Sequence, residues 1–129
     1  MYSFSNRSKD ILMTCHSDII TVCRELIKQM DVTVLCGHRT MSEQNAAFKA
    51  GTSKVQYPNS KHNKTPSLAV DLAPYPIDWD DLSRFKEMWI RFDTLAKYLK
   101  ECGEIQSDFI WGGNWKTLKD YPHIEIKEI

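Results

Sequence analysis

The 129-residue sequence predicts an α+β fold in which helices flank a small, mainly antiparallel sheet. Three observations favour this class. Segments of helical periodicity and short apolar segments of strand character are interspersed along the chain. The predicted strands are short and their connections are irregular, which argues against a doubly wound parallel sheet. The length matches the commonest domain size, so we expect residues 1–129 to form a single domain.

The first third of the chain predicts a helix, a strand and a second helix. The first helix extends over about 8–30, where apolar residues recur every three or four positions. The β-rich segment DVTVLCG, 31–37, then predicts a short strand. Thr40 and Glu43 have the spacing of a capping box, and Gly51 marks the end of the helix that they begin.

The remainder predicts a loop, a strand, a long helix and two further strands. The polar segment 52–67 leads into the apolar segment SLAVDLAPYP, 67–76, which predicts a strand. Apolar residues recur at helical spacing over 82–99, and Gly103 ends that helix. The last two predicted strands are DFIWGG and HIEIKEI, joined by NWKTLKDYP.

Composition and charge narrow the classes of partner. Hydrophobic residues make up 42% and charged residues 26% of the chain, as in an ordinary folded protein. The 17 basic and 17 acidic residues balance, which removes the usual electrostatic argument for nucleic acid or an anionic membrane as partner. No apolar run approaches the roughly 20 residues of a membrane-spanning helix. The first residues also lack the apolar core of a secretory signal, so we expect a protein made in the cytoplasm.

Asp71 is an unexpected residue in the strand predicted at 67–76. In an extended segment its side chain shares one face with Ala69 and Ala73, while the leucine and valine side chains lie on the other. Burial of an unpaired carboxylate is costly. The sequence therefore predicts that Asp71 has a cationic partner: an arginine, another cation or a metal.

Two of the four histidines complete a possible metal site with Asp71. A catalytic zinc site takes three protein ligands and keeps a fourth position for water. His62 lies in the polar loop before Asp71 and His123 opens the last predicted strand, so the three side chains can supply such a set. The same ligands also suit iron or manganese. Of the other histidines, His16 is expected on a helix surface, and His38, at the end of a strand, is ambiguous.

Asp120 is the candidate general base. Residues three apart in a regular strand face opposite ways, but Pro122 favours a local break that would bring Asp120 toward a metal held by His123. Glu125 shares the face of His123 and is either a rival base or a partner of that ligand. Arg39 can bind a substrate carboxylate or stabilise an oxyanion, although a surface arginine is the ordinary interpretation.

The four cysteines, Cys15, Cys23, Cys36 and Cys102, show no CxxC spacing. Each lies in an apolar context, so we interpret all four as small reduced core residues and not as disulfides or zinc ligands.

The motifs SKHNKTPSLAVDLAPYPIDW and KDYPHIEI resemble those of the zinc D-Ala-D-Ala carboxypeptidase and L-alanyl-D-glutamate endopeptidase family, especially its small phage endolysins. The family pattern is Ser-x-His, then Ala-x-Asp, then Asp/Glu-x-x-His. GHRTMSEQNAAFKAGTSK and WGGNWKTLKDYPHIE extend the resemblance over residues 31–127. The chain departs from many relatives in a longer interval between His62 and Asp71, and in Ser67 at the place of a common glycine.

This resemblance implies a hedgehog/DD-peptidase-like fold and assigns roles to seven residues. The implied zinc ligands are His62, Asp71 and His123. The implied catalytic residues are Asp120, as base, and Arg39, which assists at the carbonyl. The implied substrate-binding residues are Ser60 and Gln44.

The function implied by the resemblance is that of a zinc metallopeptidase that hydrolyses an amide bond in the stem peptide of bacterial peptidoglycan. Both the L-alanyl-D-glutamate endopeptidase and the D-Ala-D-Ala carboxypeptidase type are open. The alternative is a non-catalytic zinc-containing binding protein of the same fold. We expect a monomer that is made in the host cytoplasm and acts on the cell wall after its release.

Overall fold

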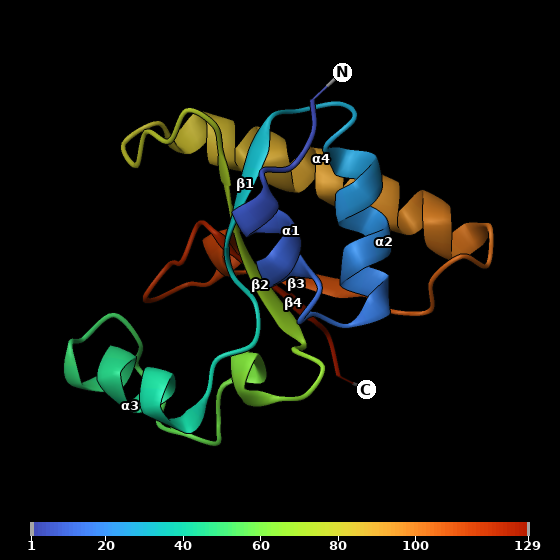
Figure 1. The fold of residues 1–129 in the computed structure, drawn as a ribbon. Helices are drawn as coiled ribbons and strands as arrows, with labels where there is room; N and C mark the ends of the chain where they lie inside the picture. The colour runs from blue at the N-terminus through green and yellow to red at the C-terminus, as the bar shows by residue number, and fades with distance from the viewer. Residues whose placement is uncertain (1, 129) are drawn as a thin grey trace.

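The computed structural model describes residues 2–128 (Figure 1). Residues 1 and 129 lie outside the described residues. Both belong to the predicted domain, and residue 129 belongs to the last predicted strand. The elements are, in chain order, α1 (Asn6–Leu12), α2 (Ser17–Leu26), β1 (Val32–Cys36), α3 (Met41–Lys49), the 3-10 turn η1 (Lys61–Asn63), β2 (Ala69–Pro74), α4 (Leu82–Glu101), β3 (Phe109–Trp111), the 3-10 turn η2 (Gly112–Asn114) and β4 (His123–Ile126).

The four strands form one antiparallel sheet in the order β1-β2-β4-β3. This confirms the predicted α+β class. Helix α4 packs against α2 and against strands β2 and β3, while α1 packs against β1 and α3 lies apart from the core (Figure 1). The largest fully buried apolar side chains lie between these layers: Phe85, Phe92, Ile19, Leu26, Leu72 and Met88.

The segment 8–30, predicted as one helix, forms the two helices α1 and α2. His16 separates them and caps α2, since its Nδ1 accepts a hydrogen bond from the Asp18 N–H at 3.0 Å. The His16 N–H donates to the Ser67 carbonyl at 2.8 Å, and Cys15 forms a β-bridge with Ser67. The prediction was wrong because apolar spacing continues across the break, whereas the backbone there pairs with a distant segment. His16 is accordingly a helix cap, not a helix-surface residue.

The two other predicted helices are confirmed as α3 and α4. Thr40 and Glu43 form the expected capping box, in which the Glu43 N–H donates to the Thr40 hydroxyl and the Thr40 N–H to the Glu43 carboxylate. Gly51 and Gly103 follow the two helices with φ of +80°, a conformation that side chains other than glycine adopt at a cost.

A β-bulge in β1 decides which side chains face Asp71. Val34 pairs with Leu72, but the next paired residue is Cys36, opposite Asp71, so Leu35 is an extra residue. Asp71 in turn pairs with His123 on β4. Because directly opposite residues share a face of a sheet, Cys36, Asp71 and His123 form one row across three strands.

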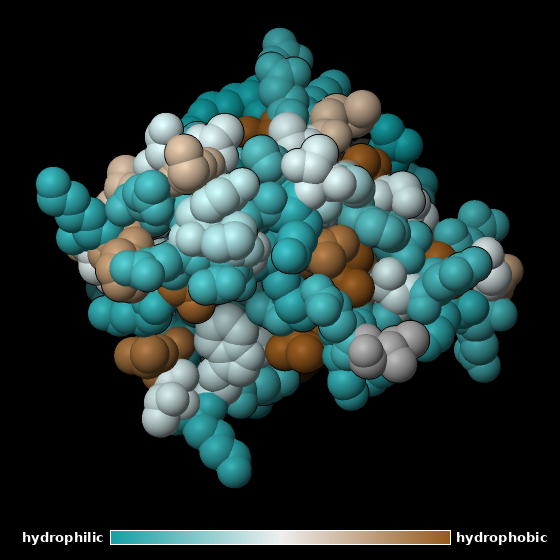
Figure 2. All heavy atoms as spheres, turned by 90° about the horizontal axis from the view of Figure 1, so that it is seen from below, coloured by the Kyte–Doolittle hydropathy of each residue, from teal (hydrophilic) through white to brown (hydrophobic). Residues whose placement is uncertain are grey.

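No helix within residues 2–128 is long and apolar enough to cross a membrane. Figure 2 shows a face on which hydrophilic side chains predominate and hydrophobic ones occur in small separate groups. Scattered apolar side chains of this kind are normal on a folded protein and do not by themselves indicate a partner.

Candidate metal and catalytic site

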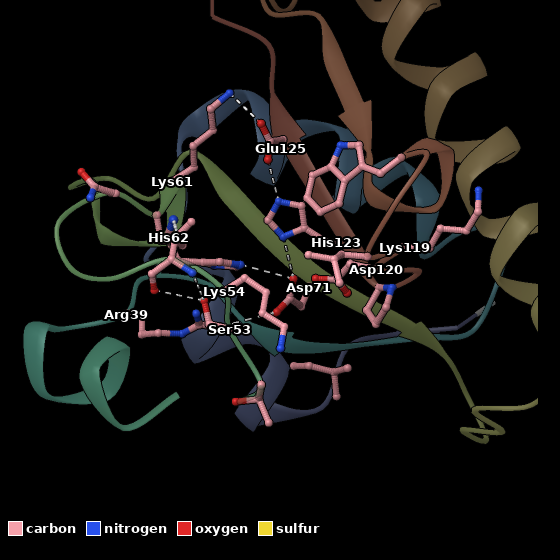
Figure 3. A pocket seen from close by; sticks show the side chains of 18 of the residues that line it. Arg39, Ser53, Lys54, Lys61, His62, Asp71, Lys119, Asp120, His123 and Glu125 are labelled. Atoms are coloured by element: carbon pink, nitrogen blue, oxygen red, sulfur yellow. Dashed lines mark hydrogen bonds and ion pairs between the residues drawn. The ribbon is translucent and has the colours of Figure 1, made fainter. Parts of the chain in front are cut away.

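A cavity of about 880 Å³ opens beside Asp71 (Figure 3). Its walls come from the η1 region, from strands β2 and β4, and from the loop between β3 and β4. The structure brings six of the seven predicted site residues to this cavity: Arg39, Ser60, His62, Asp71, Asp120 and His123. The seventh, Gln44, does not line it.

His62 reaches Asp71 from the short turn η1. The Ser60 hydroxyl caps this turn by accepting a hydrogen bond from the His62 N–H at 3.2 Å. The buried ring donates from Nδ1 to the Gly37 carbonyl at 2.7 Å. This bond fixes the ring orientation and leaves Nε2 3.3 Å from Asp71 Oδ1.

His123 reaches the same oxygen from the first position of β4. Its Nδ1 lies 3.2 Å from Asp71 Oδ1, and its Nε2 donates to Glu125 Oε1 at 2.8 Å. The other carboxylate oxygen of Glu125 pairs with Lys61 Nζ at 2.7 Å, as Figure 3 shows. Lys61 precedes His62 in the chain, so this ion pair ties the turn η1 to β4. The contacts of Glu125 favour a role as partner of His123 over that of a rival base.

Three atoms that can accept a hydrogen bond lie close together in the cavity: His62 Nε2, His123 Nδ1 and Asp71 Oδ1. The outward ring nitrogens of His62 and His123 carry hydrogens for Gly37 and Glu125. In the neutral rings, both inward nitrogens therefore present lone pairs to the Asp71 carboxylate. Such an arrangement needs protons or a shared cation between its members. Of the partners expected for Asp71, the structure shows an arginine, Arg39, whose Nη2 lies 3.9 Å from Asp71 Oδ2, beside the two histidines.

The ionisation of these groups follows from their contacts. Burial would lower the pKa of His62, but the hydrogen bond with Asp71 opposes it, and with the smaller contributions of neighbouring groups the pKa rises to about 10. Burial would also lower the pKa of His123, but its hydrogen bonds with Asp71 and Glu125 outweigh burial, and the pKa rises to about 9. Burial would raise the pKa of Asp71, but hydrogen bonds from the two histidines bring it well below its usual range. Without metal, protons hold the cluster together.

Among the described residues, one group of possible metal ligands has its ligand atoms within 4.8 Å of one another, namely Cys36, His62 and Asp71, and His123 is not part of it. The interpretation of all four cysteines as core residues is therefore only half correct. All four are free thiols, and Cys15 and Cys23 are buried, but Cys102 is exposed and Cys36 is partly buried beside Asp71. The periodicity of the sequence does not predict that Cys36 lies beside Asp71, because the bulge at Leu35 shifts the strand register there.

Asp120 precedes a tight turn that leads the chain into β4. The His123 N–H donates to the Asp120 carbonyl at 3.2 Å across this turn, so the break expected from Pro122 is present. The Asp120 N–H donates to the Gly112 carbonyl at 3.1 Å. Burial, and then the charge of Asp71, raise the pKa of Asp120 despite opposing cationic neighbours. A carboxyl group with a raised pKa can accept a proton and return it, as a general base requires.

Arg39 follows β1 and lines the cavity, with its Nη2 3.9 Å from Asp71 Oδ2. Its Nη1 donates to Gln44 Oε1 at 2.9 Å. Gln44 is fully buried, and its Nε2 donates to the Ser53 hydroxyl at 2.9 Å and to the Val55 carbonyl at 2.7 Å. Both polar atoms of the Gln44 side chain are engaged within the protein, which makes Gln44 a residue that positions Arg39 from behind.

Aromatic side chains line part of the cavity. Trp115 lies with its ring centroid 5.2 Å from that of His123, and Trp79, which is 56% exposed, also lines the cavity. Trp111 is buried in the core, and Tyr57 is exposed but does not line the cavity. Trp79 and Trp115 therefore are the aromatic residues available to a ligand in this cavity.

Comparisons with known proteins identify the family of the chain. A family model described as phage L-alanyl-D-glutamate peptidase matches residues 1–129. The chain is 32% identical over 114 residues to the peptidoglycan L-alanyl-D-glutamate endopeptidase CwlK of Bacillus subtilis (strain 168). That alignment covers 77% of this chain and 62% of CwlK, so the chain spans less than two thirds of that relative's length.

A solved structure is also similar. The Serratia marcescens L-Ala D-Glu endopeptidase ChiX superimposes with a TM-score of 0.78 and 28% sequence identity. The superposition covers 98% of this chain and 91% of ChiX.

Proposed function

Because the chain belongs to the phage L-alanyl-D-glutamate peptidase family, we propose that it is a zinc-dependent endopeptidase of bacterial peptidoglycan. The bond that it hydrolyses is the amide between L-alanine and D-glutamate in the stem peptide. The names of the two relatives, both L-alanyl-D-glutamate endopeptidases, support this bond over the D-Ala-D-Ala bond. Family membership also supports peptidoglycan stem peptides as the partner.

His62, Asp71 and His123 would hold the zinc ion. Two imidazole nitrogens and one carboxylate are a donor set of catalytic zinc, which keeps a further position for water. The hydrogen bonds from His62 to Gly37 and from His123 to Glu125 are of the kind that orient metal-binding histidines. When bound, zinc lowers the pKa of water and polarises a carbonyl group.

The other residues of the cavity act on protons and charge. Asp120 takes a proton from the attacking water and returns it to the leaving amine of D-glutamate, in keeping with its raised pKa. Arg39 stabilises negative charge on the carbonyl oxygen, and Gln44 keeps Arg39 oriented. The cavity of about 880 Å³ suits a peptide segment, since ligand sites commonly measure roughly 300–1,000 Å³.

The observation that carries this proposal is the convergence of His62, Asp71 and His123 in one cavity with Asp120. The test is digestion of peptidoglycan of defined composition with the zinc-loaded protein, followed by mass spectrometry of the released fragments. We expect stem peptides with a new N-terminal D-glutamate and no free D-alanine. Release of D-alanine, or no cleavage at all, would contradict the proposal.

Substitution of Asp120 separates its role from that of the metal ligands. We expect Asp120→Ala to retain one zinc ion per chain and to lose turnover by about 10²–10⁴-fold, the usual contribution of a general base. His123→Ala should lose both zinc and turnover. Zinc content and hydrolysis of a purified muropeptide measure the two effects separately. Full activity in Asp120→Ala would exclude Asp120 as the base.

The alternative is a binding protein that keeps the zinc without hydrolysis. It is less well supported, because a protein that only binds a ligand does not need a carboxyl group of raised pKa beside the metal ligands. We further propose that the protein acts as a monomer, is made in the host cytoplasm and reaches the wall after its release. Membership of a phage peptidase family supports this route.

A further inference from the structure

We propose that Cys36 is a further protein ligand of the metal, to which it contributes a thiolate. This inference rests on the metal centre of the proposed function but not on its hydrolytic activity. It adds a soft sulfur donor to the two imidazoles and the carboxylate. Several features of the structure support it.

The first feature is the strand register. The bulge at Leu35 puts Cys36 directly opposite Asp71. Without that extra residue, Leu35 would lie opposite Asp71, and Cys36 would lie opposite Val70, a fully buried core residue. Bulges often re-aim a side chain next to an active site. Here the re-aimed side chain is a potential metal ligand.

The second feature is distance. The ligand atoms of Cys36, His62 and Asp71 lie within 4.8 Å of one another. In a tetrahedral zinc site with ordinary bond lengths, such atoms are roughly 3.3–3.6 Å apart. The difference is small enough for side-chain rotations to close, since Cys36 and Asp71 already lie opposite each other on the sheet and His62 reaches Asp71 from η1.

The third feature is the side from which the sulfur approaches. His62, Asp71 and His123 line the cavity, whereas Cys36 does not, so the thiol would reach the ion from a side other than the cavity. A fifth coordination position therefore stays available on the cavity side, and zinc can expand to five ligands. The Arg39 guanidinium, with Nη2 3.6 Å from Sγ, is placed to stabilise negative charge on the sulfur.

A thiolate ligand has a consequence for metal choice. Thiolate favours zinc and the thiophilic divalent ions over magnesium, calcium and manganese, which prefer oxygen ligands. Cys36 would also add a second anionic ligand beside Asp71 and hold the ion more tightly. The thiol loses its proton when the metal binds, so metal binding releases that proton to solvent.

Cobalt substitution tests the inference directly. The full chain is stripped of metal and loaded with cobalt(II), and its absorption spectrum is recorded. We expect a thiolate-to-cobalt charge-transfer band in the near ultraviolet. The band should disappear in Cys36→Ser and persist in Cys102→Ser, a matched control at an exposed thiol away from the site. We also expect Cys36→Ser to bind zinc more weakly by about tenfold or more.

A second measurement covers the case in which Cys36→Ser does not fold. In the unmodified protein, zinc should slow alkylation of Cys36 but not of Cys102, as followed by peptide mass spectrometry. Absence of the charge-transfer band, survival of the band in Cys36→Ser, or equal alkylation of Cys36 with and without zinc would each overturn the inference. Hydrolysis of peptidoglycan by the zinc-loaded protein is measured separately. If the zinc-loaded protein cleaves but the cobalt-loaded protein shows no charge-transfer band, only the thiolate ligand is overturned. If the band is present but the zinc-loaded protein does not cleave, only the proposed function is overturned.

Discussion

At the scale of single residues, the site depends on which nitrogen of each histidine faces Asp71. His62 donates from Nδ1 to a backbone carbonyl, whereas His123 donates from Nε2 to Glu125. The two rings thus offer different nitrogens to one carboxylate oxygen. The sequence identified the three residues, but the ring nitrogen that each offers depends on contacts made after folding. The pairing of Glu125 with Lys61 is another such contact.

Glu125 provides a prediction at this scale. Glu125→Gln removes the negative charge that holds His123 and pairs with Lys61, so zinc affinity should fall by about tenfold, the lower end for loss of an outer partner of a ligand. Competition with a chromophoric chelator measures this. Glu87→Gln, at an exposed residue that pairs with Arg91 on α4, is the matched control and should leave affinity unchanged. Intact zinc affinity with lost turnover would instead identify Glu125 as the base.

At the scale of elements, strands and helices followed from the sequence where local pattern decides them, as in α3 with its capping box and α4 with its final glycine. Two features did not. The break between α1 and α2 depends on pairing with Ser67, and the bulge in β1 depends on the register with β2. Both are set by segments distant in sequence, which periodicity within a short window does not report.

The loop between β3 and β4 carries Asp120 and gives a prediction at this scale. A Cβ added at Gly112 would collide with the Asp120 carbonyl oxygen and lie 3.0 Å from the Asp120 Cβ. Gly112→Ala should therefore displace Asp120 and lower kcat. Gly103→Ala, at the end of α4 with φ of +80° and open space around it, is the control. It should cost about 1–2 kcal/mol of stability and leave kcat unchanged. Equal kcat in the two variants would contradict this account of the loop.

At the scale of the whole molecule, residues distant in sequence meet at one cavity, and the antiparallel sheet brings them together. Family motifs in the sequence were sufficient to predict the fold class and to name the residues that gather there. They did not predict that Gln44 lies behind Arg39, that Trp79 faces the cavity, or that Cys36 stands opposite Asp71. Those placements follow from packing and register.

The stability of the metal-free protein should depend on pH through the same cluster. The pKa values of His62 and His123, about 10 and about 9, lie above the ordinary value of 6.5. Their protonation therefore stabilises the fold fully below pH 6.5, and this contribution is lost as the pH rises through 9 and 10. The lowered pKa of Asp71 contributes stability above 3.8, which is lost only in strong acid. From pH 6.5 to about 8, the stability change therefore comes from the histidines. Above that, the buried thiols of Cys15 and Cys23, whose pKa values burial raises, add to the fall in the same way with and without zinc.

Thermal unfolding across this pH range measures the effect. Chelator-treated protein should show a Tm that falls between pH 6.5 and 10. Zinc-loaded protein should show a smaller fall, because the metal takes the place of the histidine protons. The same slope with and without zinc would contradict the assignment of these histidines to the metal.

Anomalous diffraction at the zinc edge, from crystals of the zinc-loaded protein, tests the central claim most directly. The account predicts one strong peak about 2.0–2.2 Å from His62 Nε2, Asp71 Oδ1 and His123 Nδ1 together, on the cavity side of the sheet. A zinc peak at other residues would contradict it. Cleavage of peptidoglycan by protein from which all metal has been removed would contradict it as well.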